Sequence, residues 1–200
     1  MKLQKYKLLY IAVVVILALL IASPVLQKVI GNSRTELFTE VWILDSTHKM
    51  DSYPFNLVSG MSSNVFIGLS NHLGKLSYYQ IQVKLRDQYE PGPDSLNLTP
   101  SSQPALYNIY VFVADNETWE LPLSFSLNFS VENETGSKAI LESMKFNGDT
   151  VNLSNYQVLA DANQHRLVNL YFEVWVFVES SDTFEYHERF VGLWLNLQSS

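Results

Sequence analysis

Three glutamates in the C-terminal part of the chain have the side-chain type and spacing for acid–base chemistry. Glu173 lies in an apolar segment, and Glu185 and Glu188 follow a polar turn at residues 179–182, so a hairpin would bring the carboxylates near one another. Hydrolysis of a glycoside needs two carboxylates, one acting as the acid and the other as the base or nucleophile. Charged pairs across neighbouring strands are also ordinary surface features. We interpret these glutamates as cross-strand surface charges and keep an envelope hydrolase as the alternative.

No other motif indicates catalysis or metal binding. The histidines at positions 48, 72, 165 and 187 are isolated and form no zinc-binding pair, and the absence of cysteine removes thiol chemistry. Residues 115–117 offer three adjacent oxygen ligands, whereas calcium takes about six to eight, so we interpret this segment as a polar hairpin turn. The chain also lacks a nucleophile elbow and a phosphate-binding loop. We predict no catalytic, metal-binding or cofactor-binding residues, and no cofactor.

Five N-x-S/T sequons follow the first 31 residues. Attachment of a glycan to asparagine requires an exposed site on an exported chain. We predict that at least one of these sites is occupied, and the alternative is that they are only polar surface turns. The candidates are Asn97, Asn116, Asn128, Asn133 and Asn152.

Aromatic side chains could either build a core or stack on the rings of a ligand. Trp42, Trp175 and Trp194 lie inside expected strands, so we assign them to the core or to packing between sheets. Trp119 lies near a turn and Tyr53 precedes a proline, which makes them candidates for surface ligand contacts. His72 is a third candidate, although residues 71–74 are also typical of a hairpin turn with Asn and Gly at positive φ.

The elements that must position these groups are strands. Apolar and polar residues alternate with the period of two that marks a strand with one buried face. The segment 170–178 is apolar on both faces, which predicts a central strand paired with residues 189–197. Residues 91–104 hold four prolines and predict a loop, 138–144 predict one or two helical turns, and 147–149 predict a turn. The strand segments with alternation are 37–44, 65–69, 79–85, 107–113 and 123–131.

This pattern predicts an all-β, antiparallel sandwich that occupies residues 31–200 as one domain. About 170 residues suffice for a real core, and without disulfides its stability must come from buried apolar surface. All 20 acidic residues and only nine basic ones follow Gly31, a net charge of −11 that opposes binding to nucleic acid.

The N-terminal segment predicts a membrane anchor. Residues 8–27 form an uncharged, mostly apolar run long enough to span about 30 Å as a helix, and Lys2, Lys5 and Lys7 precede it. The positive flank predicts a cytoplasmic N-terminus and an extracellular domain, with residues 1–30 as cytoplasmic tip and transmembrane helix. A cleaved secretory signal is the alternative. In a third interpretation, the helix itself pairs with a membrane partner.

Several segments carry a resemblance to a known family: residues 35–44, 51–57, 68–74, 78–83, 118–119 and 189–195. Their order resembles the extracytoplasmic part of an archaeal membrane-protein family described as domain of unknown function 1616. The resemblance covers most of residues 35–197. It implies an immunoglobulin-like sandwich on the cell exterior and no assigned activity. Family members often carry several membrane helices before this domain, whereas one is expected here.

Together these features predict a single-pass, membrane-anchored extracellular module that acts by contact and without catalysis. Its expected partners are the lipid bilayer, through residues 8–27, and another membrane protein, a surface-layer protein or a surface glycan. The alternative is a protein that binds or processes envelope glycans.

Overall fold

The computed structural model describes residues 6–7, 10–18, 37–132 and 137–199, which form two units, Met1–Leu37 and Phe38–Ser200. In the first unit, residues 10–18 are helical. Within the described ranges, no helix has both the length and the apolar character needed to cross a membrane. Residues 8–9 and 19–27 of the predicted membrane segment lie outside the described residues.

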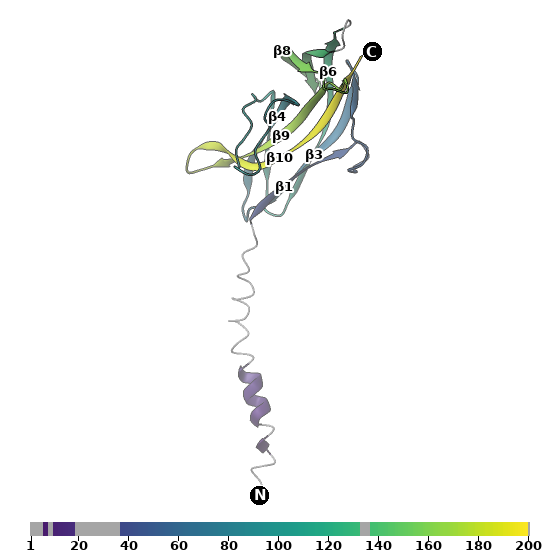
Figure 1. Cartoon of the computed structure of the whole chain (residues 1–200). Coiled ribbons are helices and arrows are strands. Elements are labelled where there is room, and N and C mark those ends of the chain that lie inside the picture. The colour runs from purple at the N-terminus through teal and green to yellow at the C-terminus, as the bar shows by residue number, and fades with distance from the viewer. Residues whose placement is uncertain (1–5, 8–9, 19–36, 133–136, 200) are drawn as a thin grey trace. The chain divides into compact units, whose positions relative to one another are not determined.

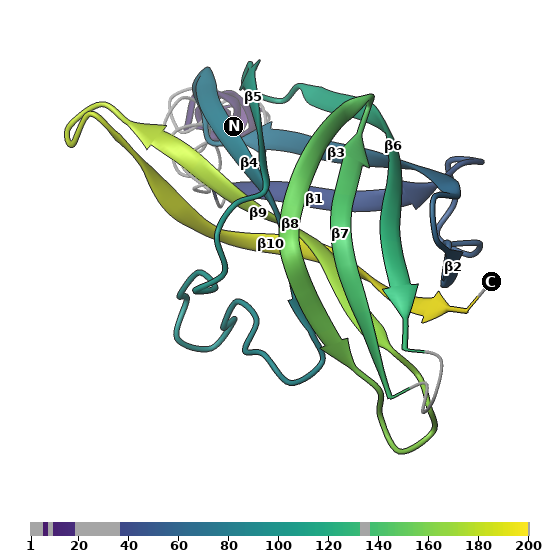
Figure 2. The ribbon, with the colours of Figure 1, turned by 90° about the horizontal axis from the view of Figure 1, so that it is seen from above.

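The second unit consists of two five-stranded sheets (Figure 1), which confirms the all-β prediction. The first sheet has the order β1-β3-β6-β7-β8 and the second the order β2-β10-β9-β4-β5. Strands β8, β7 and β6 lie side by side in front of β9 and β10 in Figure 2. The strands are β1 Phe38–Asp45, β2 Asn56–Val58, β3 Ser62–His72, β4 Ser77–Asp87, β5 Tyr107–Val113, β6 Thr118–Val131, β7 Lys138–Phe146, β8 Asp149–Leu159, β9 Leu167–Val178 and β10 Thr183–Gln198.

Alternation along the strands builds the core between the two sheets. In β4, the side chains of Tyr79, Ile81 and Val83 are fully buried, and the residues between them face outward. In the first sheet, Ile67 and Leu69 are alternate residues of β3 that are buried in the same core. The strands expected from alternation are all present, because one face of each strand is buried against the opposite sheet.

The prediction of a central strand at residues 170–178 is also confirmed. Strand β9 pairs with β10 on one side and β4 on the other, both antiparallel. The loop of residues 91–104 covers part of its outward face: the backbone N–H of Ser101 donates to Glu173, and the Tyr171 hydroxyl donates to Ser101 Oγ. The apolar pattern on both faces therefore reflects the opposite sheet on one side and, over part of the strand, this loop on the other.

Helical turns at residues 138–144 were a wrong prediction, because this segment is strand β7. Its buried residues are Ala139, Leu141, Met144 and Phe146. The spacing of three between Leu141 and Met144 comes from a register shift against β8, and a local spacing of three imitates a helix. The predicted turn follows: Asn147 and Gly148 have φ values of 46° and 98° and join β7 to β8.

The segments 71–74 and 115–117 do not close hairpins, contrary to expectation. The first joins β3 of one sheet to β4 of the other, and the second carries β5 back to β6. Gly74 has a positive φ of 72°, but Asn71 is a buried residue inside β3. The two crossings lie side by side, because the N–H of Asn116 donates to the Asn71 carbonyl and the N–H of Asn71 to that of Glu117.

The three tryptophans assigned to the core lie on outward faces instead. Each alternates with buried aliphatic residues, so it points away from the sandwich. Trp42 covers Gly68, where an added Cβ would approach its Cε2 to 2.1 Å. Trp194 is 39% exposed, and the guanidinium of Arg86 lies 4.8 Å from its ring centroid.

Candidate functional site

The outward side of the second sheet gathers aromatic residues at one end. Since Ile81 and Ile109 face the core, the alternate positions of β4 and β5 face outward, and the same holds for β9 and β10. We call the resulting cluster the aromatic face. It consists of Tyr78, Tyr110, Phe112, Phe177 and Phe184.

Ring contacts hold the aromatic face together while leaving two of its rings exposed. Tyr78 stacks on its cross-strand partner Phe112 with 4.1 Å between centroids, and Phe184 lies 5.1 Å from Tyr78 and 5.7 Å from Tyr110. These contacts bring the end of the β9–β10 hairpin against β4 and β5. Phe112 is 65% exposed and Tyr110 is 52% exposed. Large, exposed apolar surfaces held in fixed positions are typical of contact sites.

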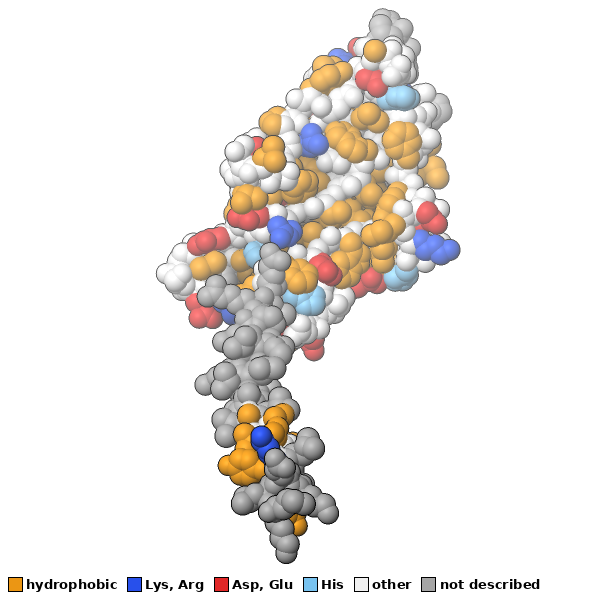
Figure 3. Space-filling model, turned by 60° about the horizontal axis from the view of Figure 1, so that its bottom comes forward, with side chains coloured by type: hydrophobic (Ala, Val, Ile, Leu, Met, Phe, Trp, Pro, Cys, Tyr) orange, Lys and Arg blue, Asp and Glu red, His pale blue; other side chains and the backbone are white. Residues whose placement is uncertain are grey.

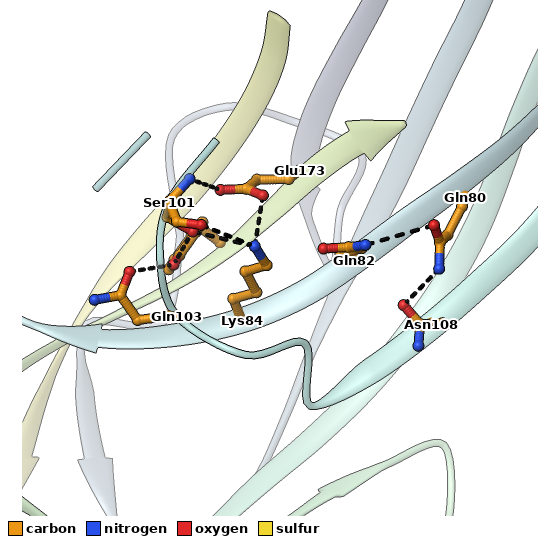
Figure 4. A network of polar contacts seen from close by, with 8 residues as sticks. Gln80, Gln82, Lys84, Ser101, Gln103, Asn108 and Glu173 are labelled. Carbon is orange, nitrogen blue, oxygen red and sulfur yellow. Dashed lines mark hydrogen bonds and ion pairs between the residues drawn. The ribbon is translucent and has the colours of Figure 1, made fainter. Parts of the chain in front are cut away.

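A row of amide side chains adjoins the aromatic face. Gln80 Nε2 donates to Asn108 Oδ1 at 3.1 Å and to the Tyr110 hydroxyl at 3.1 Å, and Gln82 Nε2 lies 3.4 Å from Gln80 Oε1 (Figure 4). Among the described residues, neither Asn108 Nδ2 nor Gln82 Oε1 has a hydrogen-bond partner. This amide row, Gln80, Gln82 and Asn108, therefore leaves the NH₂ group of Asn108 and the side-chain oxygen of Gln82 available to solvent or a ligand.

Beyond the amide row lies a buried ion pair. Lys84 Nζ is 2.7 Å from Glu173 Oε2, and the side chains are 4% and 0% exposed (Figure 4). Ser101 in the covering loop closes the site: its N–H donates to Glu173 at 2.8 Å, and its hydroxyl oxygen lies 3.2 Å from Lys84 Nζ. The Tyr171 hydroxyl donates to Ser101 Oγ, and burial raises the pKa of Tyr171 to about 12. The loop and the pair therefore form one neutral, closed unit.

The interpretation of Glu173 as a surface charge is wrong, because the covering loop buries it. Glu185, moreover, does not share a face of the sheet with Glu173. Glu185 is opposite Val176, whose side chain faces the other side of the sheet from Glu173, and it is exposed and accepts a hydrogen bond from Ser181. Glu188 lies in the irregularity between Tyr186 and Arg189, with a φ of 58°.

The three predicted ligand-contact residues are separate from the aromatic face and already engaged. Trp119 packs partly buried against the core. Tyr53 also packs there, and its hydroxyl donates to the Ile43 carbonyl at 2.7 Å. His72 stacks on Phe38 with 4.6 Å between centroids and lies 3.1 Å from Asn116 Oδ1.

The aromatic face could have been predicted from the alternation of core and outward residues along the strands. In β5, Ile109 and Val113 are the core residues, so Asn108, Tyr110 and Phe112 had to face outward. No single residue marks the amide row, because its members lie on two strands that are distant along the chain. Only the register of β4 against β5 brings them together.

Two further features of the described residues offer no chemistry. A hollow of about 590 Å³ over β3 and β6 is lined by residues such as Phe66, Pro122 and Asn147, none of which titrates. No group of histidine, aspartate or glutamate within the described ranges could hold a metal ion.

Figure 3 shows hydrophobic side chains spread over the middle of the domain face in view, with acidic ones mostly around its borders.

A buried polar chain joins the two sheets near the start of β1. His187 Nε2 lies 2.8 Å from Thr39 Oγ1, which lies 3.0 Å from the Tyr79 hydroxyl, and Tyr79 donates to Asn71 Oδ1 at 2.9 Å. Burial lowers the pKa of His187 and raises that of Tyr79. The neutral forms of both residues therefore predominate in the folded domain at neutral pH.

This histidine predicts a pH dependence of stability. The folded domain binds the proton on His187 more weakly than the unfolded chain does, so the contribution of His187 is complete above pH 6.5 and is lost as the pH falls below it. In the variant His187→Gln, the midpoint of thermal unfolding is expected to fall less steeply as the pH is lowered below 6.5. The Thr47 hydroxyl holds the pKa of Asp45 below 3.8, so the contribution of Asp45 to stability is lost only at more acidic pH. If the midpoint of the variant depends on pH as steeply as that of the native protein, His187 is not the source of the pH dependence.

Comparison with known proteins identifies the family. Residues 32–150 match the family model described as domain of unknown function 1616. No curated protein matches the chain. Among solved structures, the chain is similar to a β-glucosidase from Listeria innocua in complex with glucose, at 14% identity over 84% of this chain and 17% of that one, with a TM-score of 0.37.

A β-glucosidase from Erythrobacter marinus is similar at 8% identity, over 80% of this chain and 16% of that one, with a TM-score of 0.33. The chain thus spans about a sixth of the length of these structures. The family match, in contrast, covers more than half of this chain and includes β1 to β7. The protein belongs to the family described as domain of unknown function 1616.

Proposed function

We propose that this chain is a membrane-anchored extracellular module that binds a partner of the cell envelope through the aromatic face and performs no catalysis. The observation that supports this most is the pair of exposed rings, Tyr110 and Phe112, fixed on a sheet beside hydrogen-bonding amides. The carboxylate of Glu173, which is opposite Gln82 on the neighbouring strand, is paired with Lys84 and covered. Such a site supplies contact surface and hydrogen bonds rather than proton transfer.

An immunoglobulin-like description of the sandwich is part of the proposal. The spatial orders β1-β3-β6-β7 and β10-β9-β4-β5 parallel the A-B-E-D and G-F-C-C′ sheets of that fold. Strand β7 departs from it, because it follows β6 along the chain, whereas strand D precedes strand E. Loops and sheet faces of such sandwiches commonly serve as contact surfaces.

The anchor is supported by the apolar run of residues 8–27 and its lysine-rich start. A cysteine introduced at exposed Leu96 should react with a membrane-impermeant maleimide on intact cells, since the chain has no other cysteine. A cysteine replacing Lys2 should react only after the membrane is opened. Labelling of the second site on intact cells would contradict the proposed orientation.

The predicted glycosylation sites differ in accessibility. Asn97, Asn116 and Asn152 lie in exposed stretches, whereas Asn128 is half-buried in β6 and its Nδ2 donates to Ser143. Asn133 lies outside the described residues. We expect Asn97→Gln to remove glycan mass from the native protein and Asn128→Gln to leave the intact mass distribution otherwise unchanged. Glycan mass on the peptide containing Asn128 would contradict this order.

The proposed function is tested by capture of partners from the native membrane. Full-length protein is solubilised in mild detergent and purified with the components that remain bound in stoichiometric amounts. Phe112→Ser is expected to lose the bound component, and Tyr89→Ser is the control because Tyr89 is a tyrosine of similar exposure outside the aromatic face. Equal capture by both variants, or no bound component with the native sequence, would refute a contact role for this face.

A further inference from the structure

We infer that the ligand of the aromatic face is an uncharged glycan, bound by stacking on Tyr110 and Phe112 and by hydrogen bonds to Gln82 and Asn108. The inference rests on the proposed function and names the ligand class of the same site. Three independent properties of the face carry it: the placement of the exposed rings, the state of the amides and the absence of net charge.

The exposed rings are placed to accept consecutive sugar units. Tyr110 and Phe112 are alternate residues of β5, so their side chains leave the same face about 7 Å apart along the strand. A pyranose ring offers a flat face of C–H groups that packs on an aromatic ring, and this contact removes apolar surface of both from water. Phe112 is supported from behind by Tyr78, at 4.1 Å and 8° between ring planes. The platform is therefore formed before any ligand arrives, which limits the entropy lost on binding.

The amides next to the rings match the hydrogen-bonding pattern of neighbouring hydroxyls. Each sugar hydroxyl can donate one hydrogen bond and accept others, so a pair of adjacent hydroxyls suits one donor beside one acceptor. Gln82 and Asn108 are directly opposite each other on β4 and β5, and they keep free an acceptor, Oε1, and a donor, Nδ2. Gln80 fixes the row through its bonds to Asn108 and Tyr110.

The charge of the site favours a neutral ligand. No charged side chain belongs to the aromatic face or the amide row, and the adjacent Lys84 and Glu173 neutralise each other under the loop. Residues after Gly31 carry a net charge of −11, which repels acidic polysaccharides and anionic lipid surfaces. A protein interface usually surrounds an apolar centre with a polar rim. Here the rings lie at one end of the sheet and the amides on one side of them, an arrangement that suits a narrow chain.

The test uses full-length protein in detergent micelles and calorimetric titration with neutral hexaoses of glucose and mannose, with the neutral polysaccharide released from the native envelope, and with oligogalacturonate as an acidic control. We expect saturable binding to at least one neutral glycan and none to the acidic one. Phe112→Ser and Tyr110→Ser should each weaken the affinity about tenfold, because one stacking contact is worth about 1.4 kcal/mol. Tyr89→Ser should bind as the native protein does, and thermal unfolding confirms that all three variants fold.

Three results would overturn the inference. If no neutral glycan binds while a protein partner is captured in a Phe112-dependent way, the ligand class is wrong and the proposed function stands. Phe112-dependent binding to lipid vesicles would instead identify the membrane surface as the occupant. If neither glycan, protein nor vesicle binding depends on this face, both the inference and the proposed function fail.

Discussion

Glu173→Gln is expected to lower the free energy of unfolding by about 3–5 kcal/mol, which corresponds to a fall of roughly 10 °C in the unfolding midpoint for a domain of this size. The variant keeps the shape of the side chain but leaves the Lys84 ammonium, 4% exposed, without a counter-charge. The attraction that offset the removal of two charges from water is then lost while the desolvation of Lys84 remains. Thermal unfolding followed by circular dichroism measures the change.

Two further variants separate this explanation from a general sensitivity of the sheet. The double variant Lys84→Met with Glu173→Leu removes both charges and should recover most of the loss, since it leaves no unpaired charge in the apolar site. Glu185→Gln removes an exposed charge from the same hairpin and should change the free energy by about 0.5 kcal/mol or less. If the double variant is no more stable than Glu173→Gln, then an unpaired Lys84 charge is not the reason why the loss of Glu173 lowers the free energy of unfolding.

Asn71→Ala is expected to lower the free energy of unfolding by about 3–5 kcal/mol, from the loss of four hydrogen bonds at a fully buried position. Its Nδ2 donates to the carbonyls of Lys75 and Val113, and its Oδ1 accepts from the Leu73 N–H and the Tyr79 hydroxyl. Alanine leaves these groups buried and unpaired. Because they belong to both crossings between the sheets, denaturant unfolding should show a lower midpoint with little change in slope.

Asn64→Ala is the matched control for this experiment. Asn64 is an exposed asparagine in the same strand, β3, so its removal should cost about 0.5 kcal/mol or less. Amide hydrogen exchange gives a second measure: protection of the Asn116 N–H, which donates to the Asn71 carbonyl, should fall in Asn71→Ala and stay unchanged in the control. Equal stability of the two variants would rule out Asn71 as the link between the crossings.

The sequence predicts this fold well where one face of a strand is buried, because burial then imposes a period of two. Prediction failed in β7, where a register shift places Leu141 and Met144 three residues apart. It also failed for Asn71, because asparagine and glycine, here three residues apart at Asn71 and Gly74, are common in hairpin turns, and nothing local shows that the chain changes sheets here. Trp42 illustrates a third limit: its parity indicated the outward face, but residue type suggested the core.

The candidate site was harder to predict than the fold, for a physical reason. Lys84 and Glu173 are 89 residues apart in the chain, and lysine and glutamate usually lie on the protein surface. Their burial depends on where the proline-rich loop places Ser101, which alternation does not indicate. The amide row likewise depends on strand register. Membrane anchoring and glycosylation, in contrast, depend on the first 31 residues and on cellular processing, and they remain predictions.

The pairing of β10 also determines when the domain can become complete during synthesis. The first sheet needs only residues 38–159, so it can form while the chain is still being made. The second sheet needs β10, whose Asn196 pairs in parallel with Asn56, 140 residues earlier. Until then the apolar side of the first sheet has an incomplete cover. The nascent chain therefore passes through an interval in which a chaperone or a neighbouring copy can bind that side, and slow translation of β9 would lengthen it.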